Sequence, residues 1–148
     1  MNKKSILTAG TLALAISTAT TAIYSAELEE IIVTAQKRAE SLQDVPISMS
    51  ALSGSTIKDN GIHSFQDLTG YVPNLEIAEN PVNTIISMRG IGIGSNQSFE
   101  QSVGIYVDGV HFGKSRQVRS GLFDIEQMEV LRGPQGILFG KNTLAGAI

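Results

Sequence analysis

Three stretches of the chain alternate apolar and polar residues with the period of a half-buried β-strand. The first covers positions 45–51, and Pro46 near its start indicates a strand beginning or a sheet edge. Two more follow near positions 84–88 and 103–107. Their inward-facing positions are Val45, Ile47, Met49 and Ala51; Thr84, Ile86 and Met88; and Val103, Ile105 and Val107.

A tight hairpin and a buried strand are predicted further along the chain. Asp108-Gly109 is typical of a two-residue hairpin turn, which would lead into a strand at 110–112. In the predicted strand 125–131, Met128 and Val130 share one face and Leu131 is apolar on the other. We therefore expect that last strand to be covered on both sides.

Two short helices are expected between the first and second strands. Ser53 or Ser55 is a suitable N-cap for a helix that runs through Asp59 and ends near Gly61. A second helix would begin at Ser64, with Asp67 three residues on as an imperfect capping box. The apolar face of that helix comprises Phe65, Leu68 and Val72, and Pro73 ends it. Short strands and short helices together predict an α+β fold with a small mixed sheet.

The N-terminus has the pattern of a secretory signal, to which we assign residues 1–26. Lys3 and Lys4 precede an apolar run at positions 6–16, and small residues follow, with cleavage expected after Ala22 or Ala26. The apolar run is shorter than the roughly 20 residues that a membrane-spanning helix needs. We expect the protein to be exported to the periplasm.

A β-prone segment follows the signal. Ile31 to Thr34 are four consecutive β-branched residues, and a polar, charged stretch continues to Asp44. An extended segment on a flexible tether is suited to adding a strand to the sheet of another protein. The alternative is that this segment is an ordinary first strand of the domain. We assign residues 27–43 to the segment and its tether, and residues 44–148 to the folded domain.

Composition narrows the classes of function. The chain has no cysteine, so it holds neither a disulfide framework nor a cysteine-based zinc site. Without Lys3 and Lys4, 9 basic residues face 14 acidic ones, which argues against nucleic acid as a partner. His63 and His111 have no second ligand nearby in sequence, and the glycine-rich stretches miss the spacing of phosphate loops. We predict no catalytic residue, no metal site and no cofactor.

The C-terminal quarter carries a family resemblance. Positions 129–136 read Glu-Val-Leu-Arg-Gly-Pro-Gln-Gly, and Phe139-Gly140 and positions 142–148 continue the pattern. These residues, together with positions 30–35, resemble the plug domain of TonB-dependent outer-membrane receptors. The resemblance implies an α+β plug lodged inside a 22-stranded transmembrane barrel. Because the chain stops at Ile148 inside an apolar run, we expect it to be the front part of such a receptor.

The resemblance also implies functional residues. A TonB box, captured by the periplasmic domain of TonB, would comprise Glu30, Ile31, Ile32, Val33, Thr34 and Ala35. Arg89 and Arg132, each at a strand end before glycine, would pair with glutamates on the inner wall of the barrel. Simple surface charge is the alternative for both arginines. Plug loops that face incoming ligand would include Ser95, Asn96, Gln97, Ser98, Lys114 and Arg116, for which a solvated loop is the alternative.

The implied function is energised uptake of a scarce solute across the outer membrane. An iron–siderophore complex is the first expectation, with cobalamin, haem or a glycan as the other ligands of the family. Two alternatives stay open from the residues alone. One is a free periplasmic α+β ligand-binding module without a barrel, and the other is a secreted enzyme.

Overall fold

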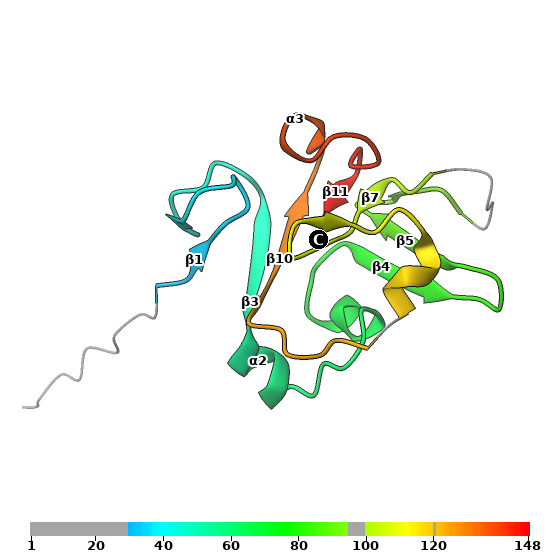
Figure 1. Cartoon of the computed structure of the whole chain (residues 1–148), viewed down its shortest axis with the longest axis horizontal. Helices are drawn as coiled ribbons and strands as arrows, with labels where there is room; N and C mark the ends of the chain where they lie inside the picture. The colour runs from blue at the N-terminus through cyan, green and yellow to red at the C-terminus, as the bar shows by residue number, and fades with distance from the viewer. Residues whose placement is uncertain (1–29, 95–99, 120) are drawn as a thin grey trace, which may run out of the picture.

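The computed structural model describes residues 30–94, 100–119 and 121–148 (Figure 1). In these residues the strands form four small sheets, joined by short helices and turns. The predicted α+β class, with a small mixed sheet and short helices, is confirmed. The predicted signal at residues 1–26 lies outside the described residues.

A four-stranded mixed sheet lies at the centre of the fold. Its order is β3 (Met49–Ser53), β10 (Gln127–Arg132), β11 (Gly146–Ala147) and β7 (Val103–Gly104). Strand β10 pairs antiparallel with both neighbours, whereas β11 pairs parallel with β7. The first predicted strand therefore begins later than expected, because the segment around Pro46 is irregular and the ladder with β10 starts at Met49.

The second sheet is an antiparallel meander of β4 (Leu75–Glu79), β5 (Thr84–Met88) and β6 (Ile91–Gly92). The predicted inward face of β5 is confirmed, since Thr84, Ile86 and Met88 are all buried. Strand β4 was not predicted, although Leu75 and Ile77 alternate with polar residues and are both buried. This alternation of apolar and polar residues is typical of a strand, but Pro73 and Asn74 directly before it favour a loop.

The third predicted strand is divided between two sheets. Val103 and Ile105 are buried as expected, but β7 ends at Gly104 and the next residues form β8 (Tyr106–Val107). Strand β8 pairs with β9 (Val110–His111), across the two-residue Asp108-Gly109 loop. The predicted hairpin turn is confirmed, because both loop residues have positive φ, as a type I′ turn requires.

The first predicted helix is present as α2 (Gly54–Asp59), and the hydroxyl of Ser53 accepts the N–H of Thr56. The cap is therefore Ser53 and not Ser55. The second predicted helix is a short 3₁₀ turn, η1 (Gln66–Gly70), in place of an α-helix. Its predicted apolar side chains, Phe65, Leu68 and Val72, are all buried. Two short helical elements were also not predicted, η2 (Ser115–Arg119) and α3 (Gly136–Phe139).

The core lies between the central sheet, the meander and the turns that cover them. Figure 1 shows the β4–β5 meander on one side of β3 and β10, and the segment around β1 (Ile32–Val33) on the other. Leu68, Met88, Ile105 and Val130 are completely shielded from solvent. Met128 and Val130 point into this core, and Leu131 is also buried, so the prediction of a strand covered on both sides is confirmed. Among the described residues, no helix has the length and apolar character that crossing a membrane requires.

Candidate functional site

The predicted TonB box is folded against the domain. Ile32 and Val33 form β1, which pairs antiparallel with β2 (Glu40–Ser41) through a turn at residues 34–37. Val33 and Ala35 are 1% and 2% exposed, while Ile32 is 46% exposed. The β-branched run therefore forms a strand, but within the described residues its partner is the chain itself.

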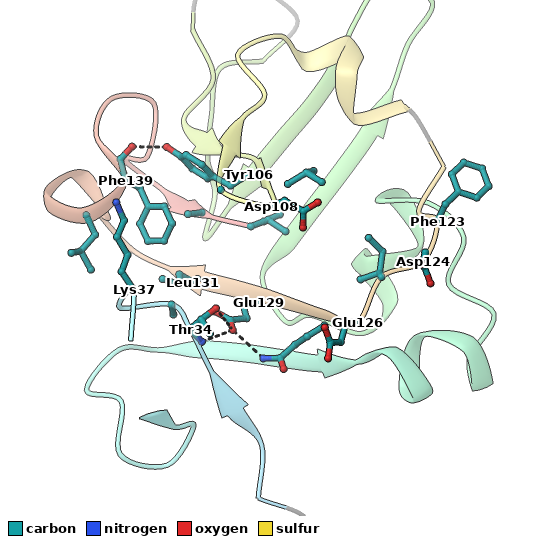
Figure 2. A pocket seen from close by; sticks show the side chains of 18 residues that line it. Thr34, Lys37, Tyr106, Asp108, Phe123, Asp124, Glu126, Glu129, Leu131 and Phe139 are labelled. Carbon is teal, nitrogen blue, oxygen red and sulfur yellow. Dashed lines mark hydrogen bonds between the residues drawn. The ribbon is translucent and has the colours of Figure 1, made fainter. Parts of the chain in front are cut away.

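Side chains of β10 reach the opposite edge of β1 (Figure 2). The carboxylate Oε1 of Glu129 accepts the Thr34 N–H at 2.6 Å and the Thr34 hydroxyl at 3.2 Å. The Nε2 amide of Gln127 donates to the carbonyl oxygen of Ile32 at 3.0 Å and also to Glu129 Oε1 at 3.0 Å. Gln127 and Glu129 are two residues apart on one strand, so their side chains lie on the same face.

A groove of about 790 Å³ opens beside this contact. Thr34, Ala35 and Lys37 line one part of it, and Tyr106, Leu131 and Phe139 line another (Figure 2). The tyrosine is fixed by a hydrogen bond from its hydroxyl to the carbonyl oxygen of Phe139, at 2.5 Å. Burial raises the pKa of Tyr106, which favours the protonated hydroxyl that donates this bond.

Arg89 and Arg132, the two predicted plug–barrel residues, come together in space. Nη2 of Arg89 donates to the hydroxyl oxygen of Ser48 at 2.9 Å, and Nε of Arg132 donates to the same oxygen at 3.2 Å. Nη2 of Arg132 also donates to the carbonyl oxygen of Met49 at 3.0 Å. The sequence placed both arginines at strand ends, and the fold brings those two ends to one point.

Neither arginine has a carboxylate partner among the described residues, where the ion pairs are Arg38–Glu40 and Lys141–Glu100. Arg89 also has an unusual backbone, with φ of 53° in the two-residue loop between β5 and β6. Gly90 follows at φ 76°, so the loop is a type I′ turn, whose first position favours asparagine, aspartate or glycine. An arginine held in a left-handed conformation is a feature that points toward function.

Of the predicted ligand-facing residues, Ser95, Asn96, Gln97 and Ser98 lie outside the described residues. Arg116 is exposed, but its Nε donates to the carbonyl oxygen of Val82 at 2.7 Å. Lys114 is also exposed, and its backbone N–H is bonded to Gln117 Oε1. Arg116 thus lies against the turn between β4 and β5, and neither loop cation bonds to the arginine pair of Arg89 and Arg132 among the described residues.

The described residues contain no group of three or more histidine, cysteine, aspartate or glutamate side chains that could hold a metal ion. His111 packs against Tyr106, with ring centroids 5.1 Å apart. Backbone N–H groups of His63 and Ser64 lower the pKa of Asp67, whose carboxylate caps η1. That carboxylate completes the predicted capping box, because the Ser64 hydroxyl accepts the Asp67 N–H.

Three residues of these sites were missed by sequence reasoning: Ser48, Gln127 and Glu129. Ser48 is one of the polar positions of an alternating strand, which marks it only as solvent-facing. Gln127 and Glu129 are likewise polar positions of β10 that alternate with buried Met128 and Val130. Alternation gave their side-chain direction, but nothing in the sequence indicated that β1 would lie over them.

The chain matches the family profile described as "TonB-dependent Receptor Plug Domain" over residues 41–147. It is 31% identical over 121 residues to the pesticin receptor of Yersinia pestis, covering 80% of this chain and 18% of the relative. It is also 31% identical over 133 residues to an iron-regulated outer membrane virulence protein of Vibrio cholerae, covering 81% and 19%.

Solved structures agree with these sequence matches. The ferric yersiniabactin uptake receptor FyuA from Yersinia pestis superposes with a TM-score of 0.61 at 35% identity, covering 68% of this chain and 16% of that one. The open form of the ferric-catecholate import receptor Fiu from E. coli gives 0.57 at 28% identity, covering 73% and 14%.

The chain spans about a fifth or less of the length of these relatives. Three of these four relatives are named as receptors, and the Vibrio cholerae relative is named as an iron-regulated outer membrane protein. The family profile covers most of the chain, and the fold agrees with it. The chain therefore belongs to the plug-domain family of TonB-dependent outer-membrane receptors.

Proposed function

We propose that this chain is the plug region of an outer-membrane receptor that imports an iron–siderophore complex with energy delivered by TonB. The observation that carries the proposal is the plug-family match over residues 41–147. The names of relatives support the class of solute, since they include a ferric yersiniabactin uptake receptor and a catecholate siderophore receptor. A relative named as a vitamin B12 transporter makes cobalamin the second candidate.

Residues Glu30 to Ala35 act as the TonB box in this proposal. The middle of the segment, Ile32 and Val33, is already extended in β1, which is the conformation that strand addition to TonB requires. Binding of ligand at the outer face would free the segment for TonB. Because the outer membrane has no nucleotide supply of its own, work would arrive as a pull on this N-terminal strand.

Arg89 and Arg132 hold the plug inside the barrel. Two guanidinium groups that share one serine hydroxyl and lack a carboxylate partner among the described residues are suited to a pair of carboxylates on a surrounding wall. The left-handed backbone of Arg89 supports the assignment, because an asparagine would satisfy the turn at lower cost. In the whole receptor, glutamates of the barrel supply the acceptors.

Lys114 and Arg116, with residues 95–98, belong to the loops that meet incoming ligand. Both cations are exposed, and a ferric siderophore often carries negative charge, so the two would attract it electrostatically. The bond from Arg116 Nε to the carbonyl oxygen of Val82 would hold the Arg116 side chain in place, and the bond from the Lys114 N–H to Gln117 would fix the backbone of that loop.

Deleting residues 30–35 from the full-length receptor tests the transport proposal. Uptake of a labelled ferric siderophore by whole cells should be abolished, while binding of the same siderophore to the cell surface is retained. Uptake that persists after the deletion would contradict the TonB-box assignment. Labelled cobalamin, run in parallel, distinguishes the two solutes. The alternative of a free periplasmic binding module predicts that the protein fractionates with the periplasm instead of the outer membrane.

A further inference from the structure

Both hydrogen-bonding edges of the N-terminal strand β1 are occupied. On one edge, the ladder with β2 uses the backbone groups of Ile31 and Val33, and the N–H of Leu42 donates to the Ile31 carbonyl oxygen at 2.9 Å. Alternate residues of a strand direct their backbone groups to opposite edges. The Ile32 carbonyl oxygen and the Thr34 N–H therefore lie at the other edge, away from β2.

That second edge is covered by side chains and not by a strand. Glu129 accepts the Thr34 N–H at 2.6 Å, and Gln127 donates to the Ile32 carbonyl oxygen at 3.0 Å. One acceptor and one donor, two residues apart on β10, thus reproduce what the edge of a neighbouring strand would offer. The bond between Gln127 Nε2 and Glu129 Oε1, at 3.0 Å, keeps the two groups together.

We infer that Gln127 and Glu129 form an intramolecular binding site for the TonB box, here called the clasp, which competes with TonB for the same edge of β1. The inference rests on the proposed TonB-binding role of residues 30–35. Strand addition needs an edge with free N–H and C=O groups. Because β2 holds one edge and the clasp holds the other, TonB can pair with the box only after one of them is released.

The contacts of the clasp also favour a particular sequence in the peptide that it binds. The Thr34 hydroxyl donates to the same carboxylate oxygen at 3.2 Å, so a threonine at this position makes two bonds to Glu129. Val33 and Ala35, on either side, are buried and fix the height of the strand above β10. The site therefore takes an extended peptide with a hydroxyl residue between two small apolar ones.

The contact between the clasp and β1 is weak enough to be reversible. Thr34 is exposed, so water competes for the bonds to Glu129, which weakens them relative to a buried charged contact. A partner that binds only the released state can bind only the molecules in which the clasp is open. Its apparent affinity is therefore its intrinsic affinity multiplied by the fraction of released molecules. Weakening the clasp should therefore tighten TonB binding without any change in the box itself.

Amide hydrogen exchange at Thr34, measured on the whole chain, tests the clasp directly. Glu129→Ala and Gln127→Ala should each accelerate exchange of the Thr34 N–H by roughly three- to tenfold. Thr34→Val keeps the β-branched shape and removes only the hydroxyl, and should give a smaller acceleration at position 34. The matched control is Glu126→Ala, which removes an exposed carboxylate directly before β10 that makes no hydrogen bond to β1 among the described residues.

Unchanged exchange at Thr34 in Glu129→Ala would overturn the clasp. Slow exchange at Val130, in the core of β10, verifies that each variant is folded. Titration with the TonB periplasmic domain then separates the two proposals. Tighter binding to Glu129→Ala than to the parent chain and to Glu126→Ala supports both. A third outcome is that exchange accelerates but TonB binds neither any variant nor a free peptide of residues 30–35. That outcome supports the clasp and contradicts the TonB role.

Discussion

Arg89 and Arg132 donate hydrogen bonds to a single atom, the hydroxyl oxygen of Ser48, at 2.9 Å and 3.2 Å. Two like charges are thereby held side by side, with no carboxylate within ion-pair distance among the residues that the structure describes. An isolated plug gains little from such an arrangement, because like charges repel. We therefore expect these positions to be optimised for a partner and not for the stability of the plug.

Replacing Arg89 by asparagine should stabilise the chain. Asparagine tolerates the left-handed backbone that Arg89 adopts at φ 53°, and the substitution removes one of two adjacent positive charges. We expect the free energy of unfolding to rise by about 0.5–1 kcal/mol, measured by urea denaturation. Asp108→Asn, at the equivalent position of the other type I′ turn, is the control and should be nearly neutral. A clear loss of stability in Arg89→Asn would contradict this reading.

Gly146→Ala should destabilise the central sheet. A Cβ at position 146 would overlap the backbone carbonyl oxygen of Leu131 and the sulfur of Met88, and the strand pairing of β11 leaves the backbone no room to move. We expect the free energy of unfolding, measured by urea denaturation, to fall by about 1–3 kcal/mol. Gly136→Ala is the matched control, because no atom lies within 4 Å of its added methyl group. Equal effects of the two substitutions would argue against close packing at β11.

Asp67→Asn should change how stability depends on pH. The N–H groups of His63 and Ser64 lower the pKa of Asp67 in the folded chain. A carboxyl group with a depressed folded-state pKa stabilises the fold above its unfolded pKa, and this stabilisation is lost as pH falls through the folded-state value. Urea denaturation between neutral pH and roughly pH 3 should show a loss below about pH 4 that is smaller in Asp67→Asn. Parallel curves for the two proteins would refute the capping role of Asp67.

Tyr106→Phe removes the hydroxyl that donates to the carbonyl oxygen of Phe139. We expect a loss of about 0.5–1.5 kcal/mol in the free energy of unfolding, because the acceptor is partly buried and loses its partner. The control is Tyr71→Phe, whose hydroxyl makes a longer, exposed bond to the carbonyl oxygen of Asn60 at 3.3 Å. A cost at Tyr71 as large as that at Tyr106 would show that burial does not set the difference.

Local chemistry made part of the fold predictable. Helix α2 followed from Ser53 as its cap, and the β8–β9 hairpin followed from Asp108-Gly109, because both depend on residues adjacent in sequence. The alternating burial of β5 followed from its period of two. The elements that could be predicted are those whose structure depends on residues close together in the sequence.

Long-range pairing was beyond reach from the sequence. Strand β11 has two residues, which is too short for a periodic signal, and nothing in the predicted strand at 103–107 indicated that β7 would pair with it in parallel. The site contacts have the same character, since the contact between Thr34 and Glu129 depends on where β1 lies over β10. The resemblance named the box and the arginines, but it gave neither the clasp nor the shared serine.

The central ladder joins segments far apart in the chain, as the bond between Arg132 and Ser48 illustrates at a separation of 84 positions. In a polypeptide that emerges amino end first, β3 is complete long before β10 exists. Closing so large a loop makes native contacts costly early and slows folding. During that interval the edge of β3 is open to pairing with other molecules, and we expect aggregation to start there.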